Sequence, residues 1–310
     1  MLYTYLDWNV FDRIEKKDTL DKDEYNIYSK FDEFIRNNKI ICPYSNAHIN
    51  DLLRGYNNDP SYTRKHLETI KRLTNNLCIV QYWGNSITTW HYRDINEFFT
   101  SALSEIDLTS MSFIEFWGED ETVDIFRSLT IPSEFKKIYK ANPIFNRIFP
   151  KTKAHLNFFA LCEDFYDLSN IIKKDNTIYK FLRNYVNQSY GKLRNHRDFL
   201  RKIDKLINDG PKHLDFYEEW EKYSPKNITS NNPAFQRITD TYLKIDFKGF
   251  KSDEKFSNMI DDSLHVFYGA NCDYFITIDD KCHYKATETY DKLGIETKAM
   301  KPDKFIDIMI

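Results

Sequence analysis

The chain has 310 residues, of which 41% are hydrophobic, enough to fill the core of one large domain or of a domain with a substantial insertion. No N-terminal signal segment, no apolar window near the roughly 18 residues of a membrane span and no CxxC pair is present, so we expect a cytosolic chain without membrane contact, disulfide framework or structural zinc. The formal charge of −3 is unevenly distributed, because residues 133–215 hold 17 Lys and Arg against 9 Asp and Glu.

Strand and helix patterns alternate along the first 90 residues. Strands are expected at 2–11, 39–45 and 77–83, and helices at 25–38, 46–55 and 61–76. The first strand is aromatic and stops at the polar residues Asp7 and Asn9, and Gly55 should close the second helix. This alternation is typical of βαβ units and predicts a parallel sheet.

The pattern changes to long amphipathic helices from about residue 96 to residue 208. Residues 210–235 hold three of the nine prolines and predict a loop-rich exit from this helical region. A helix near 254–270, a strand at 272–279, a further helix and a β-like segment at 294–300 then restore the α/β pattern. We therefore expect one α/β domain formed by residues 1–95 and 236–310, with a helical insertion over 96–235.

Four aspartates occupy positions that suit a metal site in such a domain. Asp7 and Asp279 each end a predicted strand, and the carboxyl ends of parallel strands meet at one edge of the sheet. Asp51 and Asp262 lie on predicted helices, where each can face the same point. Four carboxylates would repel one another without cations, and a cluster rich in oxygen ligands suits Mg²⁺ or Mn²⁺.

Each acid alone is ordinarily a turn or helix cap, so only the ordered set predicts a metal site. Ser45, His48 and Asp51 recur every third residue, and His265 follows Asp262 at the same spacing. The histidines are candidate metal ligands, although supporting or core hydrogen bonds are the favoured interpretation.

The motifs YLDWNVF, YSNAHINDL and DDSLHVFYGANCDYFITIDD, in this order, resemble those of the PIN and PIN-like nucleases. The resemblance covers about residues 1–90 and 250–308 and implies a PIN-like parallel sheet flanked by helices. It differs from the family pattern in having Asp rather than Glu as the second acid, in a slightly short helix after the third acid, and in the long insertion. The acids that it matches, in order, are Asp7, Asp51, Asp262 and Asp279, and the supporting groups are Asn9, Ser45 and Thr277.

The resemblance implies a nuclease in which the four acids hold Mg²⁺ or Mn²⁺ and hydrolysis leaves a 5′ phosphate, with RNA favoured over structured DNA. The basic residues that would grip the nucleic acid are Lys192, Arg194, Arg197 and Arg201, although a merely solvated helix surface explains the basic excess equally well. A chain of this size would suit a toxin or antiphage defence effector that a cognate protein holds inactive. The alternative is a PIN-like module that binds nucleic acid or protein and works mainly through a partner.

The neighbouring acids form two pairs, Asp261 with Asp262 and Asp279 with Asp280, and one acid of each pair is expected to face the metal. The T-x-D spacing places Asp279 on the same side of its strand as Thr277. Asp280 would instead stabilise the N-terminus of the following helix.

Overall fold

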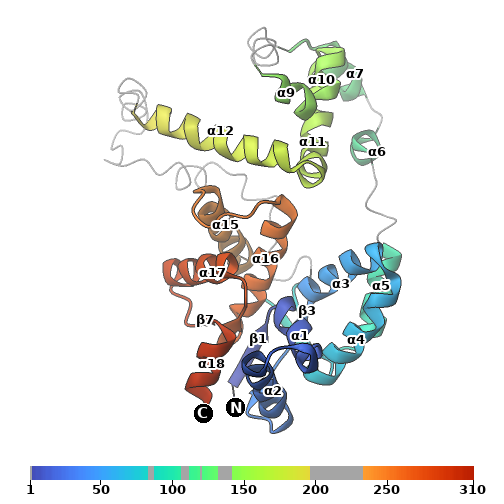
Figure 1. Ribbon diagram of the computed structural model, residues 1–310. Helices are drawn as coiled ribbons and strands as arrows, with labels where there is room; N and C mark the ends of the chain where they lie inside the picture. The colour runs from blue at the N-terminus through green and yellow to red at the C-terminus, as the bar shows by residue number, and fades with distance from the viewer. Residues whose placement is uncertain (1, 83–86, 106–111, 119–120, 132–141, 196–232) are drawn as a thin grey trace. The chain divides into compact units, whose positions relative to one another are not determined.

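The computed structural model describes residues 2–82, 87–105, 112–118, 121–131, 142–195 and 233–310 (Figure 1). These residues divide into two compact units. The first unit holds the described residues within 2–104, 233–253 and 258–310, and the second holds those within 105–195 and 254–257. The predicted domain boundaries at 95 and 235 stay predictions.

A four-stranded parallel sheet flanked by helices lies in the first unit, which confirms the predicted α/β class. Its order is β2-β1-β6-β7, with β1 at Leu2–Leu6, β2 at Ile40–Ile41, β6 at Tyr274–Ile276 and β7 at Lys298–Met300. In the central pair, Tyr5 of β1 lies opposite Phe275 of β6. Two segments far apart in the sequence therefore form adjacent strands, and their carboxyl ends lie side by side.

A second, three-stranded sheet has the order β3-β4-β5, with β3 at Tyr44–Ser45, β4 at Leu77–Val80 and β5 at Thr89–Tyr92. β3 and β4 are parallel, whereas β4 and β5 are antiparallel. The single strand predicted over 39–45 is therefore wrong in one respect: β2 and β3 belong to different sheets. The split falls at Pro43, which has no backbone N–H to donate to a strand partner.

The strand predicted over residues 2–11 is wrong after Leu6, because helix α1 occupies Trp8–Glu15. The aromatic and β-branched residues of this segment favour a strand locally. Its buried residues, however, are Val10, Phe11 and Ile14, the spacing of one helical face. The prediction that Asp7 directly follows the first strand is confirmed, since β1 ends at Leu6 and Asp7 is the N-cap of α1.

The other long helices of the first unit are α2 (Lys22–Arg36), α3 (Asn46–Asn58), α4 (Pro60–Thr74), α5 (Ile95–Glu105), α15 (Pro233–Phe247), α16 (Phe256–Gly269, in this unit from Asn258), α17 (Asp280–Leu293) and α18 (Pro302–Met309). The expected end of α3 at Gly55 is wrong, because the helix continues for another turn. The core between these elements is aromatic: Phe31 of α2 stacks on Phe305 of α18, with ring centroids 5.4 Å apart. Sheet and helices thus share one packed interior, which holds the strand ends in place.

The described elements of the second unit are helices: α6 (Phe113–Trp117), α7 (Glu121–Ser128), α9 (Pro143–Ile148), α10 (Pro150–His155), α11 (Phe158–Lys174) and α12 (Asn176–Asn195). They confirm the helical pattern predicted for this part of the chain. Ile148, Leu161 and Ile178 are buried in its core. Most of the loop predicted over 210–235 lies outside the described residues.

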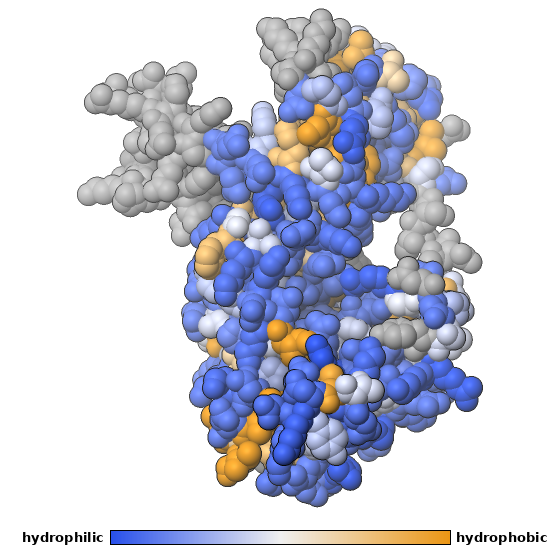
Figure 2. Space-filling view, viewed as in Figure 1, coloured by the Kyte–Doolittle hydropathy of each residue, from blue (hydrophilic) through white to orange (hydrophobic). Residues whose placement is uncertain are grey.

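The surface carries no large hydrophobic area on the face drawn in Figure 2, where hydrophobic residues form separate groups among hydrophilic ones. In the part of the chain that the structure describes, no helix combines the length and apolar character needed to cross a bilayer.

Candidate functional site: an acidic cluster at the ends of β1 and β6

Asp7 lies where β1 and β6 end. Its backbone N–H donates to the Ile276 carbonyl of β6 over 2.9 Å, and Thr277 Oγ1 donates to Asp7 Oδ2 over 2.7 Å. The carboxyl group is buried. Burial raises its pKa, whereas the positive charge of His265 and the hydrogen bond from Thr277 act in the opposite direction. The sheet therefore holds the Asp7 carboxyl group at its edge, where burial disfavours the ionised form.

Ser45 and His48 join helix α3 to this edge. Ser45 is the N-cap of α3, accepting from the Ala47 N–H over 3.1 Å, while its own N–H donates to His48 Nδ1 over 3.0 Å. Because Nδ1 accepts, the proton of the neutral ring lies on Nε2, which donates to the Leu6 carbonyl over 2.8 Å. Burial and then the charge of His265 lower the His48 pKa, so this histidine stays neutral. It makes core hydrogen bonds that attach α3 to the end of β1.

His265 of α16 lies at the centre of the cluster. Its Nε2 is 2.8 Å from Asp51 Oδ2 and 3.8 Å from Asp7 Oδ1. Burial alone would lower the His265 pKa, but the hydrogen bond with Asp51 and the charges of Asp7, Asp51 and Asp262 raise it to about 9. His265 is therefore an imidazolium at neutral pH, with both ring nitrogens acting as donors.

Tyr5 completes a buried chain of hydrogen bonds that the sequence did not predict. Its hydroxyl lies 3.0 Å from His265 Nδ1 and 2.6 Å from Ser45 Oγ. Since the imidazolium donates to the Tyr5 oxygen, the Tyr5 O–H is left to donate to Ser45. Tyr5 lies two residues before Asp7, so both point to one side of the strand. That spacing was the available signal, but an aromatic residue in an apolar strand indicates core first.

Asp51 is bound from two sides. Besides His265 at Oδ2, it contacts Arg54 at Oδ1 over 2.7 Å, and the same guanidinium reaches Asp261 Oδ2 at 2.6 Å. Two cationic groups therefore already neutralise the acid that the family resemblance assigns to the second ligand position.

Asp262 and Asp279 complete the set at the partly exposed side of the cluster. The Tyr242 hydroxyl donates to Asp262 Oδ2 over 3.3 Å. Burial and then the charges of Asp7 and Asp253 raise the Asp262 pKa well above its usual range. Asp279 follows β6 closely and caps α17, accepting at Oδ1 from the backbone N–H groups of Lys281 and Cys282, each over 2.7 Å.

Asp280 lies in the first turn of α17, at the helix N-terminus where it was expected, whereas the N-cap that accepts from the first amides is Asp279. Asp280 is exposed, with Oδ1 2.6 Å from Lys301 Nζ. The strand predicted over 272–279 is too long, because β6 ends at Ile276 and Asp279 lies three residues later as the N-cap of α17.

The structure thus brings Asp7, Asp51 and Asp262 around His265. It places Asp279 in the same neighbourhood, because the charges of Asp262, Asp7 and Asp279 add to burial in raising the Cys282 pKa. Asn9, in contrast, is exposed on α1. Of the predicted nucleic-acid contacts, Lys192 and Arg194 belong to α12 without described side chains, and Arg197 and Arg201 lie outside the described residues.

A second ionic group, also unpredicted, lies beside this cluster. Lys285 of α17 is fully buried, with Nζ bonded to Asp253 and 2.9 Å from Asp246 Oδ1. It lies over the Tyr242 ring, 4.7 Å from the centroid. The sequence feature that could have predicted this group is Lys285 itself, which lies on the buried face of α17 next to Ala286. A lysine there requires buried acids nearby.

Within the described ranges, no three His, Cys, Asp or Glu side chains are arranged to hold a metal ion. Carboxylate oxygens are the ligands that a hard divalent cation prefers. Asp7 and Asp279 lie near each other at the ends of β1 and β6, because the Thr277 hydroxyl donates to Asp7 and accepts from the Asp279 N–H, and the charge of Asp7 raises the pKa of Asp262 on α16. A cation would relieve this repulsion. Asp51 already has His265 and Arg54 as partners.

Comparisons of this chain with family models, curated proteins and solved structures give no match.

Proposed function

We propose that this chain is a divalent-metal-dependent nuclease with a PIN-like α/β domain, acting on phosphodiester bonds of RNA or of structured DNA. The observation that supports the proposal is that Asp7 and Asp279 lie at the ends of β1 and β6, linked through the Thr277 hydroxyl, while the charge of Asp7 raises the pKa of Asp262 on α16. Buried like charges are costly unless a cation compensates them. A fold that gathers them is suited to binding Mg²⁺ or Mn²⁺.

In this proposal Asp7, Asp262 and Asp279 would hold the metal. Each is positioned by a different hydrogen bond: Thr277 fixes Asp7, Tyr242 fixes Asp262, and the first amides of α17 fix Asp279. When bound, the metal would lower the pKa of a water molecule and neutralise charge on the phosphodiester.

His265, kept protonated by Asp51, lowers the pKa of Asp7. Asp51 keeps His265 protonated, and the imidazolium charge, 3.8 Å from Asp7, lowers the Asp7 pKa against the effect of burial. Asp7 is thereby kept closer to the ionised form that a hard cation requires. The Tyr5 hydroxyl holds the opposite side of the His265 ring.

The second candidate function is that of a binding module with the same α/β domain, which binds nucleic acid or protein and works mainly through a partner protein. It is favoured by one observation: the cluster contains its own cations, with His265 and Arg54 on Asp51. In that case the acids would be structural and the protein would have no need of metal.

To test the nuclease proposal, the purified full chain is incubated with Mn²⁺ or Mg²⁺ and labelled single-stranded and duplex RNA and DNA. Asp7→Asn and Asp262→Asn should each reduce cleavage at saturating Mn²⁺ by more than the roughly 10–100-fold lost when a supporting residue changes, because the amide lacks the charge that binds the cation. In EDTA both variants should melt at or above the temperature of the parent, since each loses a buried charge whose pKa is raised.

The matched control is Asp280→Asn, which removes the same charge one residue from Asp279 at an exposed site paired with Lys301. It should cleave like the parent. Metal binding is measured separately: Mn²⁺ at 100 times its Kd should add about 2.7 kcal/mol to the unfolding free energy. Parent-like cleavage by Asp7→Asn would contradict the proposal. Absence of both cleavage and stabilisation by Mn²⁺ would favour the partner-dependent module.

A further inference from the structure

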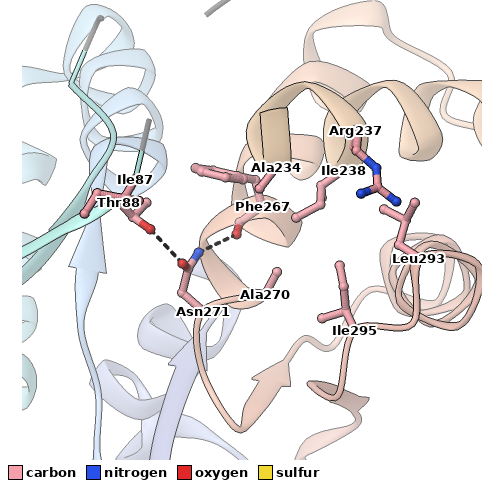
Figure 3. A pocket seen from close by; sticks show the side chains of 10 residues that line it. All are labelled: Ile87, Thr88, Ala234, Arg237, Ile238, Phe267, Ala270, Asn271, Leu293 and Ile295. Carbon is pink, nitrogen blue, oxygen red and sulfur yellow. Dashed lines mark hydrogen bonds between the residues drawn. The ribbon is translucent and has the colours of Figure 1, made fainter. Parts of the chain in front are cut away.

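A cavity of about 330 Å³ lies at the ends of three helices, away from the acidic cluster (Figure 3). Its lining comes from the first turns of α15, the end of α16 and the residues around the end of α17, together with Ile87 and Thr88 just before β5. The volume is near the lower end of the range for ligand sites, about 300–1,000 Å³. The cavity is therefore large enough for a small organic molecule.

The walls are mainly apolar. Ile238 of α15, Phe267 of α16, and Leu293 and Ile295 at the end of α17 face a common space in Figure 3. Such a lining favours a ligand with a hydrocarbon or aromatic body, because burying that body removes apolar surface from water.

The neutral polar side chains of the lining are already bonded to each other and to the backbone. Thr88 Oγ1 donates to Asn271 Oδ1 over 2.7 Å, and Asn271 Nδ2 donates to the Phe267 carbonyl over 3.0 Å. These two hydrogen bonds attach Thr88 to the end of α16. The Thr88 hydroxyl and the Asn271 amide therefore already have partners within the cavity wall. A polar ligand group would therefore have to find its main partner elsewhere in the lining.

That partner is Arg237, the one charged side chain among the described residues that line the cavity. It is exposed on α15, one residue before the buried Ile238, and Figure 3 shows its guanidinium at the edge of the apolar space. An arginine remains cationic at any physiological pH and binds carboxylates through two parallel hydrogen bonds. None of the described residues that line the cavity is acidic and could compete for it.

We propose that this cavity binds a small organic monocarboxylate, with its apolar body between Ile238, Phe267 and Ile295 and its carboxylate on Arg237. A single cation matches a single negative charge, which favours a carboxylate over a doubly charged phosphate. This site is additional to the proposed nuclease site and does not depend on it.

The test is isothermal titration calorimetry on the full chain in EDTA with 4-phenylbutyrate, compared with the neutral 4-phenylbutan-1-ol. The acid should bind at least about tenfold more tightly than the alcohol, because only the acid makes charge-assisted hydrogen bonds. Arg237→Gln should reduce the affinity for the acid to that for the alcohol. Lys248→Gln, which removes one positive charge at an exposed position just after α15, should leave both affinities unchanged.

Ala270→Leu adds bulk to the cavity wall and should weaken binding of both compounds. Circular dichroism and melting temperatures show whether the variants are folded. Equal affinities for acid and alcohol, an unchanged affinity of Arg237→Gln, binding that Ala270→Leu leaves intact, or no binding of the acid at millimolar concentration would each overturn the proposal. Cleavage with Mn²⁺ is measured without ligand, so failure here leaves the nuclease test unaffected.

Discussion

Two buried ionic groups lie next to each other in the first unit, and they differ in how their charges are balanced. Lys285 is fully buried and bonded directly to Asp246 and Asp253, and the Asp253 N–H also donates to Asp246 over 2.8 Å. Burial raises the pKa values of Asp7 and Asp262 in the neighbouring cluster, as it does that of Asp253, so the two groups differ in their contacts rather than in this shift. The first group has a lysine in direct contact with both acids, whereas the second leaves two acids without such a contact.

This difference fits a structural role for the first group and the metal-binding role proposed for the second. A buried ion pair that is closed on itself holds helices together: Lys285 joins α17 to α15 and to the segment after it. The charge of Asp7 raises the Asp262 pKa, which destabilises the fold, and a cation bound at the proposed site would relieve this repulsion. The two groups also communicate, because the charge of Asp253 raises the Asp262 pKa and that of Lys285 lowers it.

The largest expected effect comes from removing the cation of the closed group. Lys285→Met should lower the unfolding free energy by about 3–5 kcal/mol, because two buried carboxylates lose their partner. Urea unfolding at neutral pH in EDTA gives the value. Asp7→Asn, measured in parallel, should cost little or nothing. Equal losses in the two variants would mean that both groups are structural and would remove the distinction between them.

A smaller effect is expected from pH. The His265 pKa is raised from 6.5 in the unfolded chain to about 9 in the fold, so its stabilising contribution is complete below pH 6.5 and is lost as the pH rises through 9. The loss amounts to roughly 3 kcal/mol over that window. His265→Gln has no such group to titrate, so the difference in unfolding free energy between parent and variant should shrink from pH 6 to pH 9.5.

The groups that face His265 define the control for this experiment. Asp51 and Asp7 lie at its Nε2, and ionisation of Asp262 also lowers stability as the pH rises, because its pKa is raised. Asp262→Asn removes that contribution and should reduce the His265 dependence without abolishing it, because Asp51 and Asp7 contribute more than Asp262 to the raised His265 pKa. A difference between parent and His265→Gln that stays constant with pH would show that His265 is neutral in the fold.

The sequence predicted the sheet edge because local patterns define it. An apolar strand followed by a polar residue is visible without any tertiary information, and this placed Asp7 at the end of β1 correctly, while the strand predicted to end at Asp279 stops three residues earlier, at Ile276. The helices were also predictable from their periodicity. Two helices were not predicted: α18 after the last β-like segment, and α1, whose aromatic and β-branched residues hid a buried face with helical spacing.

The hydrogen-bond partners could not be predicted in the same way, because they depend on contacts between distant segments. The Tyr5 hydroxyl hydrogen-bonds to His265, 260 residues later in the sequence. Lys285 pairs with Asp246 of α15 and with Asp253 in the segment after it. No spacing rule relates such residues. Asp51 shows the limit of motif matching, since its sequence position fits a ligand while Arg54 and His265 occupy its oxygens.

The smallest expected effect concerns Asp279, which belongs to both a helix and the acidic cluster. Asparagine is nearly as good an N-cap as aspartate, so Asp279→Asn should keep α17 and its melting temperature while losing the charge that a cation would bind. Asp279→Ala removes the acceptor for the Lys281 and Cys282 amides and should cost about 1 kcal/mol in addition. If cleavage falls in both variants while stability falls only in the alanine variant, capping and metal binding are separate functions of one carboxylate. If instead the asparagine variant cleaves like the parent, Asp279 is a cap alone, and the metal proposal would have to rest on Asp7 and Asp262.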